Sequence, residues 1–95
     1  MVVGLCLITL RLHGNTSLKG KRSIVKSIKD KVRGHFNVSI AEVDMQDVLQ
    51  RAEIGLAAVG NDRAFINSVI DKAIRKIEGL NRAEIIESRL EIMNM

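Results

Sequence analysis

Residues 37–62 read NVSIAEVDMQDVLQRAEIGLAAVGND, and this stretch decides the fold. It holds two short segments rich in strand-forming residues, 37–44 and 52–60, separated by the polar connection MQDVLQR. Two such segments with a connection too short for a crossover helix predict an antiparallel pair of strands. Asp62 follows the second segment and is a favourable residue to cap the start of a helix.

The chain upstream of this pair predicts a strand and then a helix. In residues 2–13 the even positions from Cys6 to Leu12 are all apolar, and the odd positions begin apolar, which is typical of a central strand covered on both sides. From residue 18 onward apolar residues recur at helical spacing. We expect a helix from about 18 to 34, capped by Ser17 or Thr16 and stopped by Gly34.

The chain downstream of the pair repeats this order. Apolar residues at helical spacing predict a second helix from Asp62 to Gly79. Residues 83–93 then alternate, with Ile86, Leu90 and Ile92 on one side and charged residues on the other. This alternation predicts a strand with one solvated face, at an edge of the sheet.

Strand, helix, strand, strand, helix, strand is the order of a ferredoxin-like βαββαβ fold. We therefore predict an α+β protein with a four-stranded antiparallel sheet and two helices on one face. Residues 1–95 form a single domain, because no linker, repeat or low-complexity segment interrupts them.

Composition narrows the class of protein. The chain has 46% apolar residues, one cysteine, two phenylalanines and no Trp, Tyr or Pro, which is a globular composition. The apolar residues 1–10 lack a basic region and a cleavage site, and are too short to span a membrane. We expect a cytoplasmic protein with Cys6 as a buried, unreactive thiol.

Two motifs carry a resemblance to a known family. SLKGKR after the first strand (17–22), followed by FNVSIAEVDMQDVLQRAEIGLAAVGND (36–62), resembles the bacterial YlxP-like family, a domain of unknown function. The resemblance covers nearly the whole chain and implies a cytoplasmic protein with a ferredoxin-like fold. It also implies gene neighbours that encode translation initiation and ribosome-binding factors. Leu49 stands at a position that is usually aromatic in the family, so a stacking role there is not expected.

Positive charge is concentrated in the first helix. Residues 1–36 contain eight basic residues and one acid, whereas residues 37–95 contain seven basic residues and ten acids. Five of the basic residues follow one another at spacings of three and four and share one helix face. We call them the basic face: Lys19, Arg22, Lys26, Lys29 and Arg33.

Two interpretations of the basic face stay open: an anionic partner, or plain solvation with pairing inside the molecule. If the partner is nucleic acid, stacking of bases on the sheet is not expected, because the two central strands offer no aromatic side chain there. The remaining mode of binding is contact between the basic side chains of the helix and the phosphates of the nucleic acid. The partner we predict is rRNA or another structured RNA.

The predicted sheet has a second surface that calls for a partner. Leu5, Leu7, Ala57 and Val59 fall on the face without helices and would leave an apolar patch in a monomer. We therefore expect a homodimer through this face, unless the strand phase is shifted by one residue.

Evidence for catalysis is weak. Glu42 and Asp44 alternate onto one face of a strand and Asp47 follows, but no histidine or cysteine spacing typical of a metal site exists. We expect structural pairing of Glu42 or Asp44 with Arg51 or with lysines of the first helix. A weak anion site at the helix start would use His13, Lys19 and Lys21.

The leading hypothesis is a non-enzymatic module, without cofactor or metal, that contacts structured RNA or ribosomal particles. The alternative is a homo-oligomeric domain that binds a small anion or regulates another protein.

Overall fold

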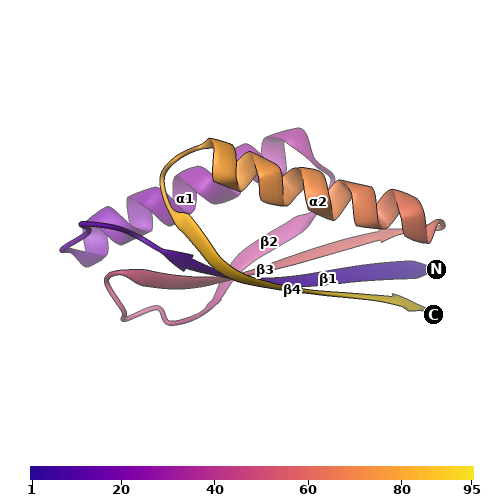
Figure 1. Cartoon of the computed structure of the whole chain (residues 1–95), viewed down its shortest axis with the longest axis horizontal. Coiled ribbons are helices and arrows are strands. Elements are labelled where there is room, and N and C mark those ends of the chain that lie inside the picture. The colour runs from indigo at the N-terminus through magenta and orange to yellow at the C-terminus, as the bar shows by residue number, and fades with distance from the viewer.

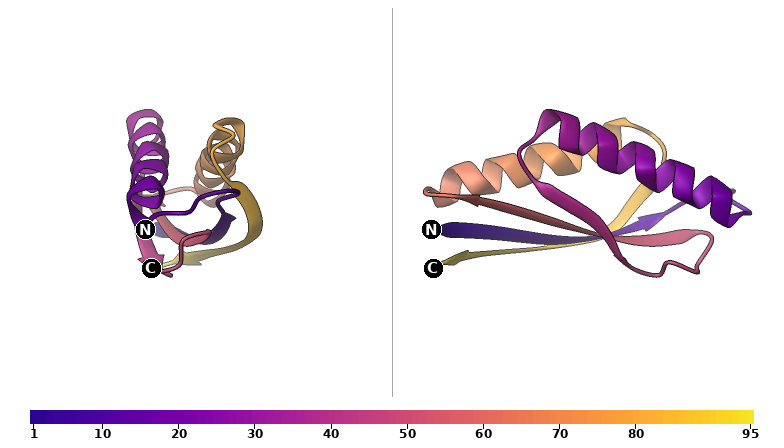
Figure 2. Two further views of the ribbon diagram at one scale, coloured as in Figure 1. Left: turned by 90° about the vertical axis from the view of Figure 1, so that its left-hand side faces the viewer. Right: turned by 180° about the vertical axis from the view of Figure 1, so that it is seen from behind.

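The computed structural model describes residues 1–95 and has the predicted order of elements. The elements are β1 (Val2–Arg11), α1 (Leu18–His35), β2 (Ser39–Asp44), β3 (Arg51–Gly60), α2 (Arg63–Gly79) and β4 (Glu84–Asn94). The strands form one antiparallel sheet in the order β2-β3-β1-β4. Both helices lie side by side over the same face of this sheet (Figures 1 and 2). The ferredoxin-like α+β fold is thus confirmed.

The predicted caps begin both helices. The Ser17 hydroxyl accepts a hydrogen bond from the Gly20 amide at 3.0 Å, and an Asp62 carboxylate oxygen accepts one from the Phe65 amide at 3.0 Å. Each cap satisfies an amide that has no partner inside its own helix.

One of the two helix ends differs from the prediction: α1 ends one residue later than expected, whereas α2 ends at Gly79 as predicted. Gly34 is not the stop of α1, because the helix continues to His35 and Phe36 follows in an extended conformation. Gly79 is the last residue of α2, but the left-handed residue beyond it is Asn81, with φ 53°. Asparagine tolerates this region better than most side chains, so it takes the role expected of glycine.

The core lies between the sheet and the helices. Seventeen buried apolar residues form one cluster, and the even positions of β1 supply Cys6, Ile8 and Leu10 to it. The odd positions of β1 lie on the opposite face, as the period of two requires. The predicted phase of β1 and β3 is therefore right, and the helix-free side, which we call the open face, carries Leu5, Leu7, Ala57 and Val59.

Two β-bulges shift the side chains of the edge strands. In β4 the register shifts opposite Thr9 and Leu10, so Ile85, not Ile86, pairs with Leu10 of the core face. Ile86 has no partner at this bulge, so it is out of register with Leu90 and Ile92, which pair with Cys6 and Gly4 of β1. A single extra residue reverses the alternation of every residue before it.

The bulge in β2 corrects the expected carboxylate pair. Glu42 pairs with Ile54 on the helix side, but the register shifts before Asp44, which pairs with Glu53 of the open face. Glu42 and Asp44 therefore point to opposite faces of the sheet, and the prediction that they share one face is wrong.

α2 packs closely onto β1 at Gly4. A methyl group at this position would lie 2.5 Å from Ile66 Cγ2 and 2.6 Å from Ile70 Cδ1. The absence of a side chain at Gly4 is what lets α2 approach the sheet here. Neither helix is both long and apolar enough to cross a membrane.

Candidate functional site

The basic face lies along the outer side of α1, next to β2. The apolar side of the helix buries Val25, Ile28 and Val32 against the sheet, which turns the charged side outward. Four of the five cations line a groove of about 380 Å³ together with Asp30 of the same helix and Glu42 of β2. We call it the basic groove; the four cations are Arg22, Lys26, Lys29 and Arg33.

One carboxylate lies among these cations. Lys26 Nζ lies 2.7 Å from an Asp30 oxygen, and Arg33 lies 3.9 Å from the other oxygen. The hydrogen bond from Lys26, helped by the charges of Lys26, Arg33 and Lys29, lowers the pKa of the Asp30 carboxyl below its ordinary value. Asp30 is therefore ionised at neutral pH and offsets one of the five positive charges.

The other three cations of the basic face have no such partner. No carboxylate oxygen lies within 4.0 Å of Lys19, Arg22 or Lys29. Glu42, which also lines the groove, has its own counter-charge in Lys21. The groove thus keeps a surplus of exposed positive charge beside the edge strand of the sheet.

Arg33 is partly tied to the fold. One of its guanidinium nitrogens donates to the Ile40 carbonyl of β2 at 3.3 Å. This bond links the end of α1 to the edge strand, and the side chain remains 54% exposed. A guanidinium has five N–H donors, so this bond leaves others free for a ligand.

Lys21 has a different place from the one predicted for an anion ligand. Its side chain is only 2% exposed, and its ammonium donates to the Met45 carbonyl and, at 2.8 Å, to the Val48 carbonyl. The Lys21 ammonium also lies 3.0 Å from Glu42 Oε2, which makes the two an ion pair. The angle between them is unfavourable for a hydrogen bond, so this buried carboxylate oxygen has no donor. The pairing of Glu42 with a lysine of the first helix is as expected, but the Lys21 ammonium is buried and directed at these groups, so it is not accessible to a bound anion.

Lys21 holds a strained loop. Met45 has φ 63°, a left-handed conformation that is costly for a long side chain. The Met45 carbonyl accepts from Lys21 and from the Val48 amide, and the Asp44 carboxylate accepts from the Met45 amide at 2.7 Å. These bonds stabilise the turn between β2 and β3 against its strain.

The other residues of the expected anion site are also not gathered. His13 Nε2 lies 2.7 Å from a Glu84 carboxylate oxygen, whose negative charge opposes an anion there. Lys19 is exposed at the start of α1. The structure therefore does not bring His13, Lys19 and Lys21 together as one site.

The candidates for catalysis are dispersed. No three His, Cys, Asp or Glu side chains lie close enough together to hold a metal ion. Cys6 is 3% exposed, and its burial, together with the nearby Asp71 charge, raises the pKa of the thiol. This thiol is protonated at neutral pH, the form that does not act as a nucleophile. Leu49 lies half-buried in the β2–β3 loop, where its carbonyl accepts from the Asn15 amide at 2.6 Å.

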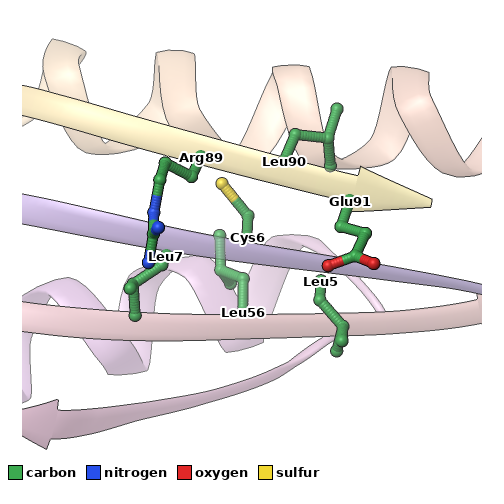
Figure 3. Close-up of a pocket in the computed structure, with 7 residues that line it drawn as sticks. All are labelled: Leu5, Cys6, Leu7, Leu56, Arg89, Leu90 and Glu91. Carbon is green, nitrogen blue, oxygen red and sulfur yellow. The ribbon is translucent and has the colours of Figure 1, made fainter.

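The open face carries an apolar patch with charges beside it. Leu5 is 38% exposed and Val59 is 60% exposed, and Val43 and Met93 extend the patch beyond the four predicted residues. Figure 3 shows Arg89 and Glu91 of β4 reaching across β1 toward Leu7 and Leu5, which are their partners in the strand register.

Sequence reasoning missed one further feature, an apolar cleft of about 330 Å³ beside the ends of the helices. It is lined by His35 at the end of α1, by Phe36 and Asn37 just after it, by the end of β3, and by Phe65 and Lys72 of α2. Phe65 is 60% exposed and lies off the apolar stripe of α2. The signal available in the sequence was Phe65 itself, a large apolar residue in the first turn of the helix that does not belong to its apolar stripe.

Together, the four-stranded antiparallel sheet, the two helices on one face and the cationic groove define a small ferredoxin-like α+β domain with a basic helix. Residues 3–90 match the model of a family described as "Protein of unknown function (DUF503)", and the chain belongs to this family. The predicted YlxP-like resemblance is thereby confirmed.

Relatives and solved structures agree with this assignment. The chain is 36% identical over 75 residues to the "Uncharacterized protein YlxP" of Bacillus subtilis (strain 168), covering 79% of this chain and 82% of that protein. Its fold is similar to that of a structure titled "Structural Genomics, protein YJCS", with a TM-score of 0.56, 10% identity and 98% of each chain covered. It is also similar to the "De novo designed protein Foldit4", with a TM-score of 0.53, 15% identity, and 99% and 97% covered. Identities this low show the fold alone.

Proposed function

We propose that this protein is a non-enzymatic cytoplasmic module that docks on structured RNA through the basic face of α1. The observation that carries the proposal is that Lys19, Arg22 and Lys29 have no carboxylate within 4.0 Å, while Lys26 and Arg33 share Asp30. Unpaired cations in a row favour a polyanion over an isolated anion, because each can neutralise a separate phosphate.

The spacing of the cations supports the same proposal. Lys19 and Arg33 are fourteen residues apart, which on an α-helix corresponds to about 21 Å. A row of this length follows a nucleic-acid backbone and exceeds any single phosphate group. Like charges three and four residues apart repel by a few tenths of a kcal/mol per pair, so stability alone does not favour the row.

The family resemblance makes rRNA the first probe to use, since it implies gene neighbours that act on ribosomes. A test is the retention of the protein on heparin and on immobilised rRNA. We expect Lys26→Glu/Lys29→Glu to elute at clearly lower salt than the wild type. Arg75→Glu/Arg82→Glu, the same change in charge at exposed positions outside the basic face, is the matched control and should elute close to the wild type. Equal elution of the wild type and both variants would remove the proposal.

A second proposal concerns the open face: we propose that it pairs with the open face of a second copy. Its support is the exposed apolar patch around Leu5 and Val59 and the pair of opposite charges beside it. In a two-fold dimer, a contact between Arg89 of one copy and Glu91 of the other would form twice, because each contact is repeated by symmetry. Such a dimer leaves both basic grooves on the outside, where each is available to RNA.

A further inference from the structure

The basic groove continues into the apolar cleft. Arg33, at the end of the groove, also lines a shallow depression over the start of β2 and the end of β3. That depression shares Asn37, Ala58 and Val59 with the cleft. The groove, the depression and the cleft therefore adjoin one another through shared lining residues, from the cations of α1 to the space between the helix ends.

The cleft gathers the aromatic side chains of the protein. Phe36 and Phe65 are the two phenylalanines of a chain without Trp or Tyr, and both line it. The His35 ring lies beside Phe36, with the ring centroids 6.2 Å apart and the planes tilted by 42°. Phe36 packs against the core, whereas Phe65 is 60% exposed, so one ring is fixed and the other is open to a ligand.

Polar groups line the same cleft in small number. His35 Nδ1 lies 3.0 Å from the Lys31 carbonyl, and because a carbonyl only accepts, Nδ1 carries the proton of this bond. The other ring nitrogen, Nε2, is then free to accept from a ligand in the neutral histidine. Lys72 and Asn37 add an ammonium and an amide. An apolar space with a few polar groups, of about 330 Å³, fits the lower end of the range for small-ligand sites.

We propose that this cleft accepts one unstacked base of the RNA whose phosphates lie along the basic groove. The inference rests on the proposed function and adds a preference to it. Proteins recognise unpaired bases of RNA by stacking them on aromatic side chains, and an unpaired base at a bulge or an end is the part of a structured RNA that can leave its helix. The charge beside the cleft favours this occupant over an apolar peptide, because Arg33 lines the adjoining depression and Lys72 lines the cleft itself.

The occupant is bound by two kinds of contact with separate consequences. The cations contact phosphates, which every RNA has, so they give affinity without selectivity. Phe65 stacks on the unpaired base, which a fully paired duplex does not offer. The protein thus distinguishes a duplex with an unpaired nucleotide from the same duplex without one.

The test uses the full chain and two RNA duplexes that differ by one bulged purine. Each duplex is closed at one end by a non-nucleotide linker, so that no loop base is unpaired, and we call them the bulged and the paired hairpin. We expect the wild type to bind the bulged hairpin more tightly, by roughly fivefold to a hundredfold, which corresponds to stacking of one base. Phe65→Ala should remove this difference while leaving the paired hairpin unchanged. Phe65→Trp should retain it, and Phe65→Leu, which is apolar but cannot stack, should behave like Phe65→Ala. Phe65 is exposed, so these changes leave the core intact, and circular dichroism checks the fold.

A spectroscopic readout accompanies the affinities. With 2-aminopurine as the bulged base, its fluorescence should fall when the wild type binds and fall much less with Phe65→Ala. Equal affinity of the wild type for both hairpins, or an equal loss on both with Phe65→Ala, would overturn the base site and leave the basic face in place. Failure of the wild type to bind either hairpin would overturn the proposed function and this inference with it.

Discussion

Lys21 Nζ and Glu42 Oε2 lie 3.0 Å apart and join α1 to β2 beneath the basic groove. The ammonium is nearly inaccessible and also bonds the carbonyls of Met45 and Val48. The most deeply buried charge of the helix is therefore structural, while its neighbours Lys19 and Arg22 face solvent. Residues that look alike in the sequence thus have separate roles.

Replacing Lys21 should cost stability. Lys21→Met removes the charge but keeps the volume, which leaves Glu42 without its counter-charge and two carbonyls without their donor. We expect the free energy of unfolding to fall by about 3–5 kcal/mol, as for other buried ion pairs that lose one partner. Urea unfolding measures it. Lys19→Met is the control and should change stability by less than about 0.5 kcal/mol. Equal stability of both variants would contradict the structural role of Lys21.

The close approach of α2 to β1 predicts the effect of a single methyl group. Gly4→Ala places Cβ 2.5 Å from Ile66 Cγ2, which is attached directly to a branched Cβ and cannot swing aside. We expect a loss of about 1–3 kcal/mol in thermal or urea unfolding. Gly34→Ala, in an exposed helix position with nothing within 4 Å of the added methyl, should instead stabilise by about 0.5–1 kcal/mol. Stability should therefore fall with Gly4→Ala, because of tight packing, and rise with Gly34→Ala, because alanine favours a helix over glycine.

How far the sequence predicts the molecule depends on the range of the interactions involved. The alternation in β1 and the helical spacing in α1 are local patterns, so strand phase, caps and element order are predicted correctly. The bulges at Val43 and Ile86 depend on pairing with β3 and β1, which no local pattern encodes. The expected face of Asp44 and the expected register of Ile86 are wrong for this reason.

The candidate site divides in the same way. The basic face follows from spacing along one helix and is found at the surface as expected. Lys21 falls near the core side of the same helix, but its partners are carbonyls of a loop whose shape depends on the left-handed Met45. The cleft is formed by segments from 35 to 72 that meet only in the folded chain. The position of Phe65 near the helix cap suggests an exposed aromatic side chain. It does not show that His35 and Phe36 line the other side of a cleft.

Removing the one carboxylate among the cations should strengthen RNA binding. Asp30 is ionised at neutral pH, because the hydrogen bond from Lys26 lowers its pKa, and it takes part of the charge of Lys26 and Arg33. We expect Asp30→Asn to bind structured RNA more tightly and to show a salt dependence steeper by about one unit of log–log slope. Glu78→Gln on α2 is the matched control and should leave the RNA affinity and its salt dependence unchanged. Weaker binding by Asp30→Asn would mean that Asp30 positions the cations instead of neutralising them.

The dimer proposal predicts the effect of a charge on the open face. Leu5→Glu places a carboxylate in the middle of the apolar patch, where the second copy would have to bury it without a partner. We expect the wild type to sediment as a dimer and Leu5→Glu as a monomer. Val48→Glu, an aliphatic residue of similar exposure on the β2–β3 loop, should remain dimeric. A wild-type chain that sediments as a monomer at every concentration tested would contradict the proposal.

The salt dependence of RNA binding tests the basic face most directly. Each phosphate neutralised by a cation releases counterions. Asp30 offsets one of the five cations, so the four remaining contacts give a wild-type slope of log Kobs against log [salt] of roughly −2.8 to −3.6. Lys26→Glu/Lys29→Glu loses two of these contacts and should be shallower by at least about 1.4 units, with lower affinity for every RNA sequence. A wild-type slope near zero, or the same slope in the wild type and the variant, would show that the cations of α1 do not contact phosphates.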